Sequence, residues 1–143
     1  MIPYLGNIAL WLALFFSLVQ IYTSFRNIYN QPEKETNVHA ICVVGIFVCI
    51  ALSFLTLMYA YIVSDFSLLN VFNNSHSAKP FLYKITGTWG NHEGSMLLWI
   101  LVLTIFNYFI FKLYNKKNSI FISKTLEIQA FITIGFILFT VLT

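Results

Sequence analysis

The chain has 143 residues, of which 59% are hydrophobic and only 9% are charged, with a formal net charge of +3. A soluble domain carries roughly 25% charged residues because its surface faces water, so this composition excludes a soluble globular domain. The few basic residues form no stretch interleaved with aromatic side chains, which excludes a nucleic-acid-binding protein.

Runs of apolar residues without charges predict helices that cross a membrane. A helical span needs ~20 mostly apolar residues, and the runs place spans near residues 4–25, 40–63, 94–113 and 125–143. The runs lack the alternation of polar and apolar residues that is typical of membrane β-strands. The sequence therefore predicts one all-α transmembrane region over residues 1–143, a polytopic bundle of about four helices with its longest connection at 64–93.

The distribution of basic residues predicts how the chain is oriented. The first and third connections lie on one side of the membrane because two spans separate them. That side holds six of the eight basic residues, namely Arg26, Lys34, Lys112, Lys116, Lys117 and Lys124. The positive-inside rule makes it cytoplasmic. We therefore expect the N-terminus and the connection 64–93 on the opposite, trans side, which in a bacterium is the periplasm.

Polar and sulfur-containing side chains inside the spans are few. Cys42 and Cys49 are seven residues apart on one helix, which separates their Cα atoms by about 10 Å, beyond the reach of a disulfide. Two cysteines are also too few ligands for a metal ion, so we expect two small buried residues and no metal site. Gln20 and Asn107 are expected to contact neighbouring helices. The spans contain no interior charge or His, which argues against an independent pump or transporter.

The end of the connection 64–93 has the composition of a structured turn before a helix. Gly87, Gly90 and Gly94 permit a close approach of the backbone. Asn91 can cap the third span, and Glu93 then falls in its first turn, where the helix dipole favours an anion. The sequence therefore predicts a capped start of this helix at the outer surface of the membrane.

The same segment also contains candidate site residues. His76, Trp89, His92 and Glu93 can line a site on the outer surface, and a His near the interface can ligate a metal ion or haem iron. The alternative is that these residues only cap the helix and anchor it at the interface. The residues alone leave both interpretations open.

Three stretches of this region resemble a known family. Ser75–Ala78, Pro80 with Tyr83 and Lys84, and the run WGNHEGSMLLW at Trp89–Trp99 are similar to the N-terminal portion of cytochrome c maturation protein F (CcmF), the haem lyase family. The resemblance implies a subunit of the lyase that attaches haem covalently to apocytochrome c. It also implies a bacterial inner membrane as the location, with an organellar inner membrane as the alternative. It implies haem as cofactor and, besides membrane lipid, these partners: the C-terminal half of the haem lyase, other cytochrome c maturation subunits, a periplasmic haem chaperone and apocytochrome c.

The chain also departs from the family pattern. The tryptophan-rich haem-handling segment of the family is absent, since only three Trp residues occur, and the resemblance assigns neither His76 nor His92 as an axial ligand. The sequence stops at Thr143, directly at the end of the fourth apolar run, which suggests a fragment or one piece of a split protein because a terminal carboxylate beside hydrocarbon is costly. We expect haem to be bound by parts of the family protein that are absent here, and the chain not to be catalytic alone. The alternatives are a non-catalytic membrane assembly or scaffold subunit and a truncated inactive fragment.

Overall fold

A computed structural model describes residues 1–30, 36–114 and 119–142. Within these ranges the chain forms helices and no strand, which confirms the predicted all-α fold class. The helices are α1 (Ile2–Asn30), α2 (Thr36–Ile62), α3 (Leu69–Asn74), α4 (Phe81–Gly87), α5 (His92–Tyr114) and α6 (Ser119–Leu142).

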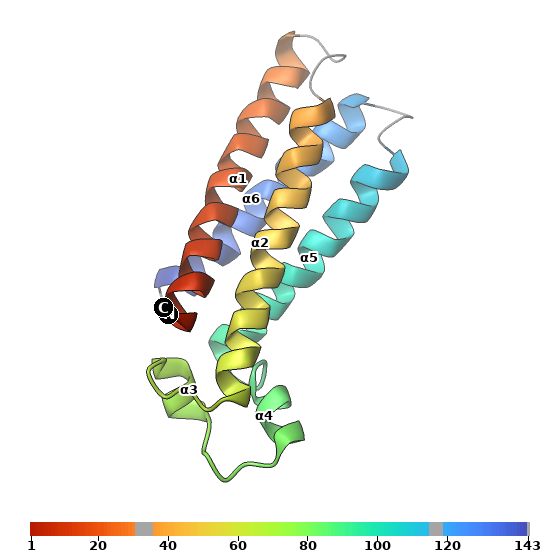
Figure 1. The fold of residues 1–143 in the computed structure, drawn as a ribbon. Helices are drawn as coiled ribbons and strands as arrows, with labels where there is room; N and C mark the ends of the chain where they lie inside the picture. The colour runs from red at the N-terminus through yellow and green to blue at the C-terminus, as the bar shows by residue number, and fades with distance from the viewer. Residues whose placement is uncertain (31–35, 115–118, 143) are drawn as a thin grey trace.

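The four long helices form an antiparallel bundle (Figure 1). Helix α1 packs against α2 and α6, and α5 packs against the same two helices on the other side. The two short helices, α3 and α4, lie together at one end of the bundle, and both ends of the chain lie at that end as well (Figure 1). Helices α3 and α4 therefore lie at one end of the bundle, and the last turns of α1 and α5 lie at the other (Figure 1).

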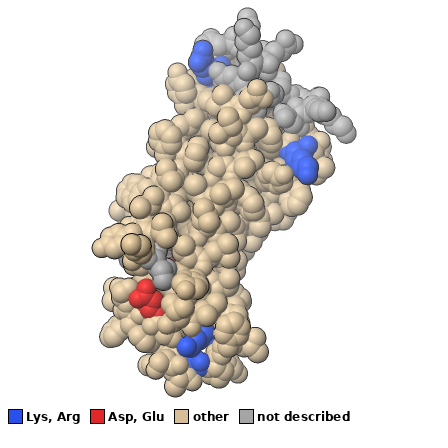
Figure 2. All heavy atoms as spheres, in the orientation of Figure 1, with Lys and Arg blue, Asp and Glu red and all other residues tan. Residues whose placement is uncertain are grey.

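The long helices are apolar enough to cross a membrane. Four candidate spans cover Pro3–Arg26, Asn37–Ile62, His92–Tyr114 and Ile120–Leu142. On the face drawn in Figure 2, Lys, Arg, Asp and Glu gather towards the two ends and leave the middle of the bundle without charge. Large apolar side chains such as Phe15, Phe106 and Phe131 are exposed along this middle zone, as expected for helices that face lipid or other helices within a membrane. The chain is therefore a multi-pass membrane protein.

The helices extend beyond several of the spans expected from the sequence. The fourth helix begins at Ser119 rather than near residue 125, and the first continues to Asn30 rather than ending near residue 25. Lys34, Lys116 and Lys117, which contribute to the predicted orientation, lie outside the described residues, as does Thr143.

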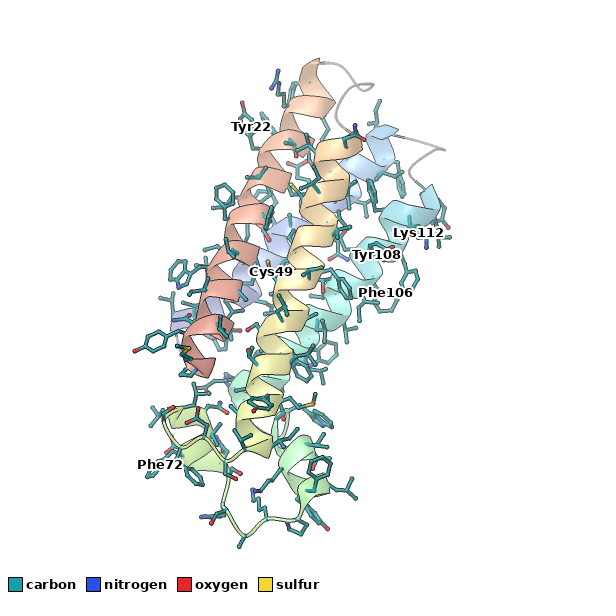
Figure 3. All side chains as sticks on the ribbon, in the orientation of Figure 1. Tyr22, Cys49, Phe72, Phe106, Tyr108 and Lys112 are labelled. Atoms are coloured by element: carbon teal, nitrogen blue, oxygen red, sulfur yellow. The ribbon has the colours of Figure 1, made fainter. Side chains whose placement is uncertain are left out.

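Side chains from all four long helices fill the centre of the bundle. The main buried cluster combines one or more residues of each helix, namely Ala13, Ile46, Cys49, Ile50, Phe54, Leu97, Ile100 and Ile137. Cys42 and Cys49 are free and buried, as predicted, and Figure 3 shows Cys49 of α2 about halfway along the bundle. Gln20 makes the predicted contact with another helix, because its Nε2 donates to the carbonyl oxygen of Leu126 at 3.0 Å. Asn107 is buried, but its Oδ1 has no hydrogen-bond partner among the described residues.

The connection between α2 and α5 is folded rather than extended. Ser64 adopts a left-handed backbone conformation with φ 56°, and the Asp65 N–H donates to the carbonyl oxygen of Ala60 at 2.9 Å, which is how helices commonly end. The chain thus turns back, and Val71 of α3 is buried against Ala60 and Tyr61. The sequence pattern predicts no helix here, because helices of six or seven residues are too short to show a hydrophobic period.

Candidate functional site

Four polar side chains meet where α2 ends and where α3 and α5 begin. The Tyr61 hydroxyl donates to Oδ1 of Asn70 at 2.6 Å, Nδ2 of Asn70 donates to Oδ1 of Asn91 at 3.0 Å, and Nδ2 of Asn91 donates to the Tyr61 hydroxyl oxygen at 2.8 Å. These three bonds form a closed ring. Nδ2 of Asn70 also donates to the carboxylate of Glu93. The ring satisfies the polar hydroxyl of Tyr61, which is completely buried and for which an unmet hydrogen bond would be costly.

Asn91 also caps α5. Its Oδ1 accepts a hydrogen bond from the Gly94 N–H at 2.8 Å, as expected for a residue that precedes the first helical turn. Glu93 lies in that first turn. The capped helix start predicted from the sequence is therefore present, and the same Asn91 side chain joins α5 to α2 and α3.

Gly94 is the one glycine of this segment that the backbone requires. A Cβ atom at position 94 would lie 1.7 Å from the carbonyl oxygen of Thr88, whereas a Cβ at Gly90 or Gly87 would meet only ordinary contacts of 3.4 Å or more. The turn that contains Trp89 thus folds directly onto the first turn of α5. This contact fixes the turn between α4 and α5 against the end of the membrane span.

The structure separates the four predicted site residues into two groups. His92 and Glu93 both line a cavity of about 250 Å³, together with Leu69, Asn70, Asn73, Asn74 and Asn91. The His92 ring also contacts the Phe139 ring of α6 edge to face, with centroids 5.3 Å apart. His76 is exposed in the segment between α3 and α4, and Trp89 is partly exposed in the turn before α5. Neither His76 nor Trp89 lines this cavity.

The cavity does not fit a haem by itself. Pockets for larger ligands usually have volumes of about 300–1,000 Å³ and mostly apolar walls, whereas this one is smaller and lined largely by amides and a carboxylate. It contains one His, and Glu93 is already bonded to Asn70. Within the described ranges, no group of three or more His, Cys, Asp or Glu residues is arranged to hold a metal ion. The arrangement can therefore hold the helices in position and present His92 at the surface.

Sequence reasoning missed Tyr61 and Asn70, which complete the network. Tyr61 belongs to the apolar run of the second span, and Asn70 belongs to a connection that shows no period. The sequence gives only a weak signal for either residue. Tyr61 places a hydroxyl close to the end of a span, and Asn70 is followed by two further Asn residues, Asn73 and Asn74. Neither observation indicates that these side chains pair with residues 21 to 30 positions further along the chain.

Comparisons with known proteins agree with the resemblance seen in the sequence. No protein-family profile matches the chain. The chain is 40% identical over all 143 residues to the cytochrome c-type biogenesis protein CycK of Rhizobium meliloti (strain 1021), covering 21% of that protein. It is 34% identical over 143 residues to the cytochrome c-type biogenesis protein CcmF of Pseudomonas aeruginosa, covering 22% of it.

A solved structure gives the same answer at the level of the fold. The chain superposes on cytochrome c haem lyase CcmF with a TM-score of 0.86 and 27% sequence identity, over 96% of this chain and 23% of that one. The match lies in the N-terminal portion of that structure. The chain thus spans about one fifth of the length of the relatives it matches. In both sequence and fold, this chain thus matches the N-terminal portion of the cytochrome c-type biogenesis proteins CcmF and CycK.

Proposed function

We propose that this chain forms the N-terminal part of a haem lyase subunit that attaches haem covalently to apocytochrome c. The observation that carries the proposal is the 40% identity over the whole chain to a cytochrome c-type biogenesis protein. The TM-score of 0.86 with a cytochrome c haem lyase supports it independently. Because the chain corresponds to about one fifth of these relatives, the catalytic activity belongs to the assembled lyase rather than to this chain alone.

The proposed location is the bacterial inner membrane, with the N-terminus and the α3–α4 end of the bundle facing the periplasm. The positive-inside rule supports this orientation, because Arg26, Lys112 and Lys124 lie near the opposite end. In that orientation His92 and the cavity beside it face the compartment in which the haem chaperone and apocytochrome c are expected.

Within the lyase, we assign this chain a positioning role. The ring of Tyr61, Asn70 and Asn91 fixes α3 against α2 and α5, and Glu93 strengthens it through Asn70. His92 is then held at the rim of the cavity, where it can contact a partner surface. Haem itself binds to the remaining portion of the lyase, with which the other maturation subunits also assemble.

Complementation tests this function. The chain is co-expressed with the remaining portion of a family relative in a bacterial strain that lacks the gene, and covalently bound haem in cytochrome c is measured by haem staining. We expect holocytochrome c only when both pieces are present. Failure of the pair to restore it, with both pieces present in the membrane, would refute the proposed function.

A His variant and its matched control test the site. His92→Ala should lower the yield of holocytochrome c, whereas His76→Ala should not, because His76 is exposed and lies outside the cavity. Membrane levels of both variants are measured by immunoblot. An unchanged yield with His92→Ala would remove His92 from the site while leaving the function of the chain intact.

A second candidate is a subunit that only assembles the complex and never contacts haem. The smallness and polarity of the His92 cavity favour it. The absorbance spectrum of the purified chain tests this second candidate: a Soret band that survives washing would exclude the pure assembly role. The absence of the band agrees with both candidates, because the first also places haem in the remaining portion of the lyase.

A further inference from the structure

A second cavity lies beside α4, and it has a different character from the His92 cavity. It measures about 420 Å³ and is lined by Asn74, Lys79, Tyr83, Thr86, Gly87 and Gly90. Asn74 lines both cavities, so the last residue of α3 separates them. The lining includes a cation and no carboxylate, whereas Glu93 lies on the other side of Asn74. The electrostatics of this second cavity thus favour an anion.

Lys79 supplies the charge. Its Nζ donates to the carbonyl oxygen of Asn74 at 2.8 Å, which holds the ammonium at the rim. An ammonium group has three donors, so two remain for a ligand. Gly87 and Gly90 contribute no side chains to the lining, which leaves room for a group of the size of a phosphate.

The position of the cavity is at the edge of the membrane. Helix α4 packs against α2, and a Cβ atom at Gly87 would lie 3.4 Å from the Tyr61 ring. Tyr61 directly precedes Ile62, where the second span ends. The lipid headgroups begin where the hydrocarbon core ends, so the cavity lies at headgroup level.

The outer surface of α4 is apolar. Phe81, Leu82 and Tyr83 follow one another at its start and are 60%, 72% and 67% exposed. A short helix with exposed apolar side chains and nearby lysines suits the boundary between headgroups and acyl chains, and Tyr is enriched at that level. A free inorganic anion makes no use of such a surface, whereas a phospholipid needs both a cation for its phosphate and apolar contacts for its chains.

We propose that Lys79 and the cavity beside α4 bind the phosphate of an anionic phospholipid, whose acyl chains run along Phe81 and Leu82. The site ties the α3–α4 end of the bundle to the membrane surface. This inference rests on the placement of the spans and not on haem lyase function, so either can fail without the other.

Lipid binding by the purified full chain tests the proposal. The chain is held in mixed micelles that contain equal amounts of phosphatidylglycerol and phosphatidylcholine, and the bound lipids are counted by native mass spectrometry. We expect the wild type to prefer phosphatidylglycerol. Lys79→Gln should reduce this preference about fivefold, the attraction of one lysine for an anionic surface, whereas Lys79→Arg should keep it.

Lys84→Gln is the matched control, because Lys84 lies in α4, five residues after Lys79, but does not line the cavity. Lys84→Gln should keep the preference for phosphatidylglycerol. If both Gln variants lost this preference equally, binding would depend on the overall surface charge and not on the cavity, and the proposal would be overturned. Equal binding of the two lipids by the wild type would overturn it too. Displacement of phosphatidylglycerol by millimolar inorganic phosphate would assign the cavity to a free anion instead. Leu82→Asp should weaken binding of the long-chain lipid, and unchanged binding would refute the acyl-chain contact.

Discussion

Replacing Gly94 with Ala should destabilise the protein, although Ala is ordinarily the better helix residue. In a helix interior Ala is favoured over Gly by about 1 kcal/mol. At position 94, however, the added Cβ would lie 1.7 Å from the carbonyl oxygen of Thr88, where an ordinary contact is 3.4 Å or longer. The turn between α4 and α5 must therefore move away from α5.

The magnitude follows from these opposing effects. Overpacking of a tight site typically costs about 1–3 kcal/mol, and the upper part of that range applies because the obstructing atom belongs to the backbone. After the gain in helix propensity, a net loss of about 2 kcal/mol remains. Gly135→Ala in α6 is the matched control, since a Cβ there meets nothing within 4 Å and should stabilise the helix by about 1 kcal/mol.

Thermal unfolding in detergent measures both variants. A thiol-reactive fluorophore reports unfolding because Cys42 and Cys49 are free and buried in the folded chain. We expect Gly94→Ala to unfold below the wild type and Gly135→Ala at or above it. If Gly94→Ala unfolded at or above the wild-type temperature, the tight packing of the turn on α5 would be wrong.

Two further predictions concern polar groups near the same end of the bundle. Tyr61→Phe removes two hydrogen bonds of the ring and leaves Oδ1 of Asn70 without its donor, whereas Nδ2 of Asn91 keeps its bond to the carbonyl oxygen of Gly87. The change should cost about 1–3 kcal/mol; the same unfolding assay checks it, with the exposed Tyr59→Phe as a control that should change little. The hydroxyl and then the backbone N–H of Ser67, at 2.6 and 3.1 Å, lower the pKa of Asp65 below its usual value of 3.8. Because the folded-state pKa is the lower one, the stabilisation of this turn is complete above pH 3.8 and is lost as the pH falls through the folded-state pKa. The NMR shift of the Ser67 amide should follow that titration in the wild type and stay constant in Asp65→Asn; a pKa at or above 3.8 would contradict the hydrogen bonds.

The spans could be predicted from the sequence because lipid imposes a simple requirement on them. Every backbone polar group in hydrocarbon must be paired within the segment, so a sufficiently long apolar run has only one outcome. The capping of α5 was equally accessible, since Asn91 and Glu93 act on backbone groups within three residues of themselves. These features depend on local chemistry.

The candidate site was only partly predictable, because long-range pairing creates it. The sequence places His92 and Glu93 next to each other, but the cavity between them and α3 exists only because Tyr61 and Asn70 bring α3 back to α5. The same fold leaves His76 outside this cavity, although His76 lies within Ser75–Ala78, one of the stretches that resemble the family. Of the three glycines that were singled out, only Gly94 meets an obstruction, which depends on where the preceding turn lies.

The even number of long helices has a topological consequence. With four crossings, the two ends of the chain and the α3–α4 segment (Figure 1) share a single compartment. The chain can thus have only two orientations in the membrane. A membrane-impermeant label at a single position, such as His76, shows which of the two is present and so places every other segment. A reporter fused at either terminus must give the same answer as that label, and disagreement between them would mean that one of the four helices does not cross.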